Sequence, residues 1–564
     1  MFKLYILLSV LWFIWIAKYL LFWLYLWQLK EYHIGRFIDH FNTNKGKKLL
    51  LDIGQFFKFI FLIVFVFDNN GLFYYLLPVL ILVYLGEFFI VFRSILNKTI
   101  KKPVETLKSL FLTIILFFAV VLYSIWTLNY VGAFQIILLI SFDILVPIIV
   151  SIVVLFFQPF FVIIRGNILK KADKKIKKIR DFENYPNKLK VIAITGSYGK
   201  TSTKEFLATI LSEKFKVLST SEHQNSEIGI ANCILQDLKP DCQIFIAEVG
   251  AYNKGKVKEV CSILNPQIGI VTGVNEQHLA LFGSLKNLLL AEGGGELAES
   301  LYKRSSKDSQ GVLFVNGDNK HCLNLYKRTG KLQRKIYSLS SKVINSNIWA
   351  EDIEIGKDFI SFVAVMKKTT FTKGSGEARE MAFFKINVLG KQNVQNLLGA
   401  ILVAKELGMT FDEISEACKN ISQKFSGMVL KQEKHGINII DSSYSSNPDG
   451  VLADLDYLKV FEGKKVIIMP CLIELGKKSV EIHEKIGNKI GEVCDLAIIT
   501  SKDRFEDLKR GAIEAGMKER NILCIPDGGQ AKAKDIYSMI MLFCKAGDTV
   551  LLEGRVSTEL IKLL

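Results

Sequence analysis

The first 165 residues contain five apolar stretches separated by short polar connections. They cover roughly residues 4–27, 53–67, 72–92, 109–131 and 134–164. About 20 apolar residues are needed to cross ~30 Å of hydrocarbon, and four stretches reach that length. The second stretch is shorter and carries Lys58, so a re-entrant segment is the alternative for it. The pattern predicts an α-helical transmembrane domain of about five helices over residues 1–165.

Beyond residue 190 the apolar positions follow a different pattern. Short runs rich in β-branched residues alternate with longer amphipathic stretches. Residues 191–194 have the length of a buried parallel strand, and residues 203–211 have the spacing of a helix. Strands that alternate with helices are typical of α/β domains. The chain is therefore predicted to join a membrane bundle to α/β domains.

The composition agrees with this division. Of the 564 residues, 50% are hydrophobic and the mean hydropathy is +0.29, which excludes a disordered chain and a purely soluble one. All nine cysteines follow residue 230 without a C-x-x-C pair, so we expect reduced thiols in a cytosolic domain.

The first apolar stretch, residues 4–27, is too long and too aromatic for a signal peptide. We therefore expect it to be retained.

Positive charge is concentrated where the chain would leave the membrane. The formal net charge is +17, and residues 166–190 contain a dense run of lysines directly after the last apolar stretch. A basic juxtamembrane linker is attracted to anionic lipid headgroups by about 1 kcal/mol per residue near the surface. A solvated linker helix is the alternative. No RNA-binding signature is present, so nucleic acid is not an expected partner.

Basic residues in the connections predict the orientation of the spans. The connections after the first and third stretches contain five Lys or Arg each, whereas those around residues 68–71 and 130–133 contain none. Basic connections remain in the cytoplasm, so five spans place the N-terminus outside the cell. The part after residue 165 then lies in the cytosol, where ATP is available. Four spans are the alternative.

The last apolar stretch contains Asp143 and Pro147. An acid in hydrocarbon is costly, which makes Asp143 a candidate for a functional intramembrane site. An acid near the interface that bonds to a neighbouring helix is an equally good interpretation.

A glycine-rich segment joins the first predicted strand of the α/β region to its first helix. It reads Gly196-Ser197-Tyr198-Gly199-Lys200-Thr201-Ser202 and resembles a P-loop with fewer spacer residues. In such a loop backbone N–H groups at a helix N-terminus bind phosphate oxygens. We expect Lys200 to reach the β- and γ-phosphates of ATP and Thr201 to offer its hydroxyl to Mg²⁺.

Two later strands end in candidate metal ligands. Glu248 closes the apolar run 243–247, and His278 follows the run 268–272 after a short connection. Ligands of open α/β sheets gather at the carboxyl ends of the strands, so both side chains are predicted to approach Mg²⁺. A structural acid that caps a turn is the alternative for Glu248, and a satisfied polar group is the alternative for His278.

Seven segments follow one another beyond residue 190. They are ITGSYGKTSTKE, the segment with His223, Asn225 and Gly229, AEVGA, NEQHLALFGS, GKQNVQN, IIDSSYSSNP, and ELG with Ser479 and His483. Together they resemble the Mur ligase family, most closely its members that add D-alanyl-D-alanine in peptidoglycan synthesis. The resemblance covers about residues 188–564. It implies a central ATP-binding domain over 191–425 and a Rossmann-like α/β C-terminal domain over 426–564.

The resemblance also implies roles for single residues. Lys200 would act on the phosphates, and Thr201, Glu248 and His278 would hold magnesium. The C-terminal loop that contains Asp441 and Asn447 would approach nucleotide and substrate as the domains close. The implied catalytic residues are Lys200, His278, Asp441 and Asn447, and the implied ATP contacts are Gly196, Ser197, Tyr198, Gly199, Lys200, Thr201, Ser202, Asn393, Asn396 and Tyr444.

The chain departs from the family pattern at several positions. No lysine stands where these ligases carry a carbamylated one, and gapless counting from Phe282-Gly283-Ser284 places Glu292 there. Glu292 is therefore a predicted ligand of a second Mg²⁺. Counting back from Glu296-Leu297 instead places Gly294 at that position, so the alignment is ambiguous and Glu296 is the runner-up ligand. A solvated Glu292 with no second metal is the alternative. The other departures are Gln392 for a histidine, Met428 for an arginine, Glu553-Gly554-Arg555 for K-G-S, and the lack of a uridine-nucleotide domain.

The first hypothesis is a multi-pass protein of the cell membrane with cytoplasmic catalytic domains. It would be an ADP-forming, ATP- and Mg²⁺-dependent amide ligase of cell-envelope precursor synthesis. Its partners would be a UDP-linked or lipid-linked carboxylate acceptor and the amine of an amino acid or dipeptide. A polymer ligase that resembles poly-γ-glutamate synthases is one alternative. A membrane-anchored pseudo-ligase that binds nucleotide as a scaffold is the other.

Overall fold

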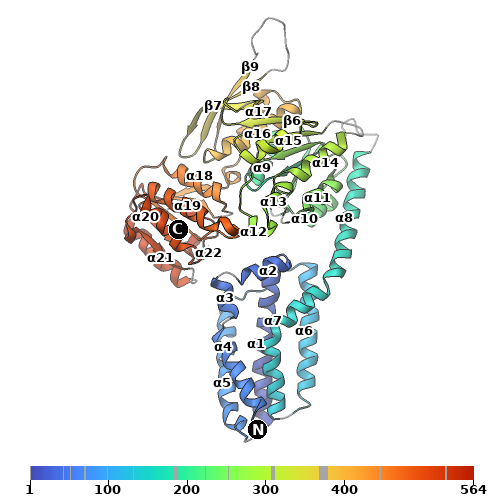
Figure 1. The fold of residues 1–564 in the computed structure, drawn as a ribbon, viewed down its shortest axis with the longest axis vertical. Helices are drawn as coiled ribbons and strands as arrows, with labels where there is room; N and C mark the ends of the chain where they lie inside the picture. The colour runs from blue at the N-terminus through green and yellow to red at the C-terminus, as the bar shows by residue number, and fades with distance from the viewer. Residues whose placement is uncertain are drawn as a thin grey trace. The chain divides into compact units, whose positions relative to one another are not determined.

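The computed structural model describes residues 2–41, 44–50, 52–68, 71–97, 99–130, 132–181, 189–222, 224–251, 253–305, 311–343, 345–367, 379–432, 435–443, 446–526 and 530–564. The chain divides into two compact units, Met1–Gly166 and Asn167–Leu564. Figure 1 shows that the first is helical and the second contains the sheets. This confirms the predicted order of a helical bundle followed by α/β domains.

The first unit contains five helical segments that are long and apolar enough to cross a membrane. They are Lys3–Leu29, Gly46–Val66, Tyr74–Leu96, Leu107–Thr127 and Ala133–Phe156. They correspond to α1 (Phe2–Leu29), α3 (Asn44–Leu50) with α4 (Ile53–Val66), α5 (Phe73–Leu96), α6 (Leu107–Thr127) and α7 (Ala133–Phe156), while α2 (Ile34–His40) lies in the first connection. The five predicted stretches are thus all helical.

One predicted bound was wrong. The last stretch ends at Phe156, and a separate helix α8 (Gln158–Arg180) begins two residues later. Pro159 removes one N–H donor at this junction, which favours the break between the two helices. The second stretch agrees with α4, which begins at Ile53, and the candidate span extends it back to Gly46 through α3. Within it α4 has its own N-cap, because the Asp52 side chain accepts a hydrogen bond from the backbone N–H of Gln55 at 3.2 Å.

The basic segment after the bundle forms most of α8. Its apolar side chains Leu169, Ala172, Ile176 and Ile179 are buried in the same core as strands of the α/β unit. Arg180 donates to the carbonyl oxygen of Leu264 at 2.7 Å. The predicted linker is therefore an amphipathic helix that is packed along one side, with its lysines on the other.

The first α/β domain is built on a nine-stranded sheet in the order β2-β3-β1-β4-β5-β6-β7-β8-β9. Its first seven strands pair in parallel, and β8 and β9 add an antiparallel extension. The strands are β1 (Lys190–Thr195), β2 (Val217–Ser219), β3 (Ile244–Glu248), β4 (Ile268–Val271), β5 (Val312–Asn316), β6 (Gln333–Ser338), β7 (Ile348–Ile355), β8 (Ile360–Lys367) and β9 (Arg379–Ile386). Because β1 lies between β3 and β4, the carboxyl ends of these three strands are adjacent.

Helices cover both faces of this sheet (Figure 1). One face carries α9 (Lys200–Ser212), α16 (Gln392–Glu406) and α17 (Phe411–Cys418); the other carries α10 (Glu227–Gln236), α11 (Lys256–Leu264), α14 (Gly295–Ser305) and α15 (Lys320–Arg328). The short helices α12 (Leu279–Phe282) and α13 (Leu285–Leu290) follow β4. Burial on both faces explains why the parallel strands are continuous apolar runs.

The C-terminal domain has a six-stranded sheet in the order β10-β11-β15-β12-β13-β14, parallel except for β10. Its strands are β10 (Val429–Gln432), β11 (Asn438–Ser442), β12 (Lys465–Met469), β13 (Leu496–Ile499), β14 (Ile522–Cys524) and β15 (Thr549–Glu553). Helices α18 (Pro448–Leu458), α19 (Ser479–Val493) and α20 (Phe505–Glu514) cover one face, and α21 (Gln530–Phe543) and α22 (Thr558–Leu563) cover the other.

Candidate active site

The loop after β1 has the backbone geometry of a phosphate-binding loop. Gly196 and Gly199 have φ angles of 142° and 76°. A Cβ atom would lie 2.3 Å from Thr272 Oγ1 at the first position and 2.5 Å from Asn396 Oδ1 at the second, so only glycine fits. Lys200, the first residue of α9, donates to the carbonyl oxygen of Gly196 at 2.6 Å. The ammonium group is therefore held across the loop at the N-terminus of the helix, where anions bind.

The first predicted pair of metal ligands is in contact. Thr201 Oγ1 donates to Glu248 Oε2 at 2.9 Å, and Asn225 Nδ2 donates to Oε1 of the same carboxylate at 3.1 Å. Glu248 is 6% exposed and lies at the end of β3, beside β1. A hydroxyl and a buried carboxylate at the rim of a phosphate loop match the oxygen ligands that Mg²⁺ prefers.

A second polar cluster joins the loop to the segment after β4. His278 Nδ1 lies 2.7 Å from Glu292 Oε1, and Ser197 Oγ donates to Glu292 Oε2 at 2.9 Å. Glu292 is 2% exposed. The alternative of a solvated Glu292 is therefore wrong. The Glu292 carboxylate lies between the phosphate loop and the His278 imidazole. This is where a second metal ion would need an oxygen ligand.

The glycines after Glu292 make its position possible. A Cβ at Gly293 would lie 2.4 Å from the carbonyl oxygen of Leu289, and a Cβ at Gly294 would lie 2.4 Å from a methyl group of Val271. Glu296, the other candidate, has a different role. Its two carboxylate oxygens accept from backbone N–H groups at the start of α11, at 2.6 and 2.9 Å, and so cap that helix.

Asn275 connects the two α/β domains at the site. Its Nδ2 donates to Asn447 Oδ1 at 3.0 Å and to Asp449 Oδ2 at 2.9 Å, and the side chain is buried. Burial raises the pKa of Asp449, and the bond from Asn275 opposes that shift. Sequence reasoning missed Asn275 as a site residue. Its place directly after β4, in the same segment as His278, is the signal that could have identified it.

Asp441, at the end of β11, is held as an anion by its neighbours. Ser443 Oγ donates to Oδ1 at 2.6 Å and Lys431 Nζ donates to Oδ2 at 2.9 Å. Burial alone would raise the pKa of Asp441, but these bonds outweigh it and lower the pKa.

Asn447 has a second contact besides the bond from Asn275. It caps α18 by accepting a hydrogen bond from the backbone N–H of Gly450 at 3.1 Å. Tyr444 lies outside the described residues.

The two asparagines predicted to lie near adenine are buried on α16. Asn393 donates to the carbonyl oxygens of Leu389 and Ser426, at 2.7 and 2.9 Å. Asn396 donates to Asn393 Oδ1 at 3.0 Å and accepts from Thr203 of α9 at 3.3 Å. Both therefore brace the phosphate-loop helix. Their contact with adenine stays a prediction.

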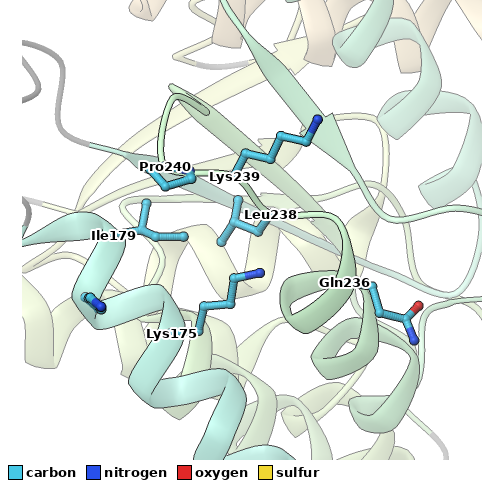
Figure 2. Close-up of a pocket in the computed structure, with 7 residues that line it drawn as sticks. Lys175, Ile179, Gln236, Leu238, Lys239 and Pro240 are labelled. Atoms are coloured by element: carbon cyan, nitrogen blue, oxygen red, sulfur yellow. The ribbon is translucent and has the colours of Figure 1, made fainter.

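A pocket of about 490 Å³ lies apart from this site (Figure 2). It is formed where α8 passes the connection between α10 and β3, which is the amino edge of the sheet. Its lining is Lys175, Lys178, Ile179, Gln236, Leu238, Lys239 and Pro240. None of the predicted site residues lines it.

Comparison with known proteins identifies the family of the two α/β domains. Residues 194–404 match the Mur ligase middle domain, and residues 428–556 match the Mur ligase glutamate ligase domain. The chain belongs to the Mur ligase family. One curated relative is the UDP-N-acetylmuramoyl-tripeptide–D-alanyl-D-alanine ligase of Escherichia coli, 28% identical over 298 residues, which are 53% of this chain and 61% of the relative. The chain thus spans less than two thirds of that enzyme.

Solved Mur ligases share the fold. MurF from Acinetobacter baumannii superimposes with a TM-score of 0.58 at 22% identity, over 71% of this chain and 79% of that one. MurF from Thermotoga maritima in complex with ADP superimposes with a TM-score of 0.53 at 22% identity, over 71% and 83%. At this identity the agreement concerns the fold alone. It covers the two α/β domains of the Mur ligase part.

The Mur ligase site suits a metal held mainly by phosphate and water. Within the described ranges, no group of three or more His, Cys, Asp or Glu side chains converges on one point. Mg²⁺ is usually held by one or two carboxylates together with substrate phosphates and water. The pair Thr201 and Glu248, and the separate carboxylate of Glu292, fit that pattern.

The remaining departures from the Mur pattern lie in packed surroundings. Met428 is 1% exposed in the C-terminal core, where an arginine would be left without solvent. Asp454 accepts from Gln392 at 3.0 Å and from Ser442 at 2.5 Å. Burial raises the pKa of Asp454 to about 6 and raises that of the neighbouring Glu553 well above its usual value. Gln392 and Glu553 are therefore linked through Asp454 at the junction of the two domains.

Proposed function

We propose that this chain is a membrane-integral ATP-dependent amide ligase of cell-envelope precursor synthesis. The observation that carries the proposal is the convergence of Thr201–Glu248 and Ser197–Glu292–His278 on one phosphate loop. The Thr201–Glu248 pair suits a metal ion at the phosphates. The Ser197–Glu292–His278 cluster places a second carboxylate beside the loop. A ligase that transfers a phosphoryl group needs such groups to stabilise the charge on it.

The proposed reaction has two steps. A substrate carboxylate attacks the γ-phosphorus of ATP, which forms an acyl phosphate and releases ADP. The amine of an amino acid or dipeptide then attacks the acyl carbon, phosphate leaves, and the nitrogen loses a proton. Bound Mg²⁺ would offset negative charge on the phosphate oxygens.

Each residue has a defined task in this scheme. Lys200 contributes a cation where charge develops on the transferred group, and the backbone N–H groups of residues 196–201 orient the phosphates. Thr201, Glu248 and Glu292 supply oxygen ligands, while His278 orients Glu292. Asn275 holds Asn447 and so keeps the C-terminal domain, which would bring the amine, at reacting distance.

The membrane helices support an acceptor that is kept at the bilayer. The family's uridine-nucleotide domain has no counterpart in this sequence, and five apolar helical segments precede the Mur ligase domains. A lipid-linked peptide precursor would be concentrated at the membrane without a domain for a soluble nucleotide carrier. We therefore propose a multi-pass membrane location, a cytoplasmic catalytic part and a lipid-linked acceptor.

The test uses the full-length protein in detergent with ATP and Mg²⁺. Phosphate release is measured with panels of amino acids and dipeptides, each paired with UDP-linked or lipid-linked peptide carboxylates. We expect release that requires one amine together with a lipid-linked carboxylate. ATP binding without release under every pairing would identify a scaffold instead. Products of growing length would identify a polymer ligase.

A further inference from the structure

Three ionisable side chains meet inside the membrane bundle. Lys58 of α4 lies 2.7 Å from Glu87 Oε1 of α5 and 2.5 Å from Asp143 Oδ2 of α7. The side chains of Lys58 and Asp143 are fully buried, and that of Glu87 is 10% exposed. All three positions lie well inside candidate membrane spans. Ionisable groups at such positions are costly and are typically functional.

Asp143 has a complete set of donors. Its Oδ2 accepts from Lys58 and from Tyr84 at 3.0 Å, and its Oδ1 accepts from Gln55 at 3.1 Å and from Trp15 at 3.3 Å. A carboxylate with four donors is stabilised in its charged form. Lys58 is equally enclosed, because the rings of Trp15 and Tyr84 lie 4.9 and 4.6 Å from its nitrogen. These two groups therefore form a stable ion pair.

Glu87 differs from Asp143 in one respect. Its Oε1 contacts Lys58, but its buried Oε2 has no hydrogen-bond partner among the residues that the structure describes. The titratable groups that interact with it are Lys58, Asp143, Asp52, Tyr84, Tyr19 and Lys18. Within the contact cluster itself, Glu87 and Asp143 share the one buried ammonium of Lys58, and the negative charge that this leaves costs several kcal/mol in hydrocarbon.

We propose that Glu87 is a proton-binding site of the membrane domain. One proton from water adds to Oε2, which converts the carboxylate to a carboxylic acid and leaves the Lys58–Asp143 pair electrically balanced. A metal cation is a poor alternative occupant, because the Lys58 ammonium already stands between the two carboxylates and would repel it. The proposal concerns the membrane domain and is independent of the ligase reaction.

Asp52 would relay the proton to Glu87 through intervening water, since the two carboxylates are not in direct contact. A Cβ atom on Gly54 would lie 3.0 Å from Asp52 Oδ1 and 3.9 Å from Glu87 Oε1, so the two carboxylates approach within about 7 Å. Asp52 is exposed at the N-terminus of α4, whereas Glu87 is buried. An exposed acid thus stands next to the buried one, with a glycine that leaves the space between them open.

The test is infrared spectroscopy of the full-length protein in lipid nanodiscs at neutral pH. A protonated carboxyl group has a C=O band separate from that of carboxylates, and Glu87→Gln should remove the band of one such group. The control is Glu105→Gln, which changes an exposed glutamate of the same unit and should leave the spectrum unchanged. Equal spectra for wild type and Glu87→Gln would overturn the proposal. Failure of Glu87→Gln to fold, while Glu105→Gln folds, would also overturn the proposal. A glutamine has the charge and shape of a protonated glutamate, so a site that is protonated in the wild type should accept it.

A second variant tests the route. Asp52→Asn keeps a side chain that can cap α4 but removes the titratable group. After transfer to deuterated water, the Glu87 band should shift severalfold more slowly in this variant than in wild type. An unchanged rate would exclude Asp52 as the route.

Discussion

The imidazole Nδ1 of His278 lies 2.7 Å from the Oε1 atom of Glu292, a buried glutamate at the position where related ligases carry a modified lysine. A carbamylated lysine is a carboxylate on a long arm, and a glutamate offers the same two oxygens on a shorter one. A Cβ atom would clash at Gly293 and at Gly294, so these two glycines permit the turn that follows Glu292. Under the proposed function, Glu292 takes the place of the modified lysine.

Glu292→Gln should lower turnover strongly and raise the Mg²⁺ concentration needed for half-maximal rate, because a neutral amide is a weaker metal ligand than a carboxylate. Added bicarbonate, which supports lysine carbamylation, should have no effect on the wild type. Phosphate release measured over a range of Mg²⁺ concentrations, with and without bicarbonate, tests these expectations. Glu296→Gln is the control, and it should lower stability by about 1 kcal/mol through the α11 cap without changing the Mg²⁺ dependence. Unchanged kinetics in Glu292→Gln would refute this role.

Lys200→Ala should abolish turnover and leave the fold intact, because it removes the cation at the transferred phosphoryl group. Phosphate release and circular dichroism check the two parts of this prediction. Lys214 lies just after α9, and Lys214→Ala, which removes an exposed ion pair with Glu413 and a hydrogen bond to the carbonyl oxygen of Gly408, should retain activity. A Lys200→Ala rate within about tenfold of wild type, or ~1.4 kcal/mol of barrier, would exclude catalytic use of the loop.

Asn275→Ala should uncouple nucleotide binding from turnover. The substitution removes both hydrogen bonds to the C-terminal domain and leaves the buried Asp449 without its donor. We expect at least a tenfold loss of turnover, about 1.4 kcal/mol, with ATP affinity nearly unchanged. Asn420→Ala, which affects only an exposed bond to Glu213, is the control. A parallel loss of ATP affinity would show that Asn275 acts on the phosphate loop instead.

Stability of the α/β unit should fall as pH rises through the range in which Asp454 and Glu553 lose their protons. Both acids have a higher pKa in the folded chain than in the unfolded one. Their contribution is therefore complete below the unfolded value of about 4 and is lost progressively as pH rises from there through the folded values, about 6 for Asp454 and well above the usual value for Glu553. Thermal unfolding of full-length protein between pH 5 and 8 measures it. Glu553→Gln should flatten this dependence, and an unaltered slope would contradict the assignment.

A cysteine introduced at Gly71 should react with an impermeant reagent added outside the cell, and one at Asn44 should not. The reason is that Asn44 lies in the first connection, whose basic residues keep it cytoplasmic, whereas the connection at Gly71 has no basic residue. Labelling in permeabilised cells controls for reactivity. The opposite pattern would reject an external N-terminus, and two cysteines with the same accessibility would show that the second segment does not cross and would favour four spans.

Several features could be predicted from the sequence because they depend on neighbouring residues. Apolar length located the five long apolar helices, and the run from Gly196 to Thr201 predicted a loop whose glycines have the positive φ angles that such a loop needs. The order of the seven motifs indicated the family. The end of α7 at Phe156 was predicted less accurately.

Only the tertiary structure decided which side chains meet. The bonds Asn275–Asn447, Ser197–Glu292 and Lys58–Asp143 join residues 172, 95 and 85 positions apart. No periodicity or spacing rule encodes such pairs, because they depend on how β1, β3 and β4 are ordered in the sheet and on how helices pack in the bundle. Asp143 shows the difference most clearly. The sequence marked it as an acid in hydrocarbon, and the packing of three other helices supplied the donors that hold its charge.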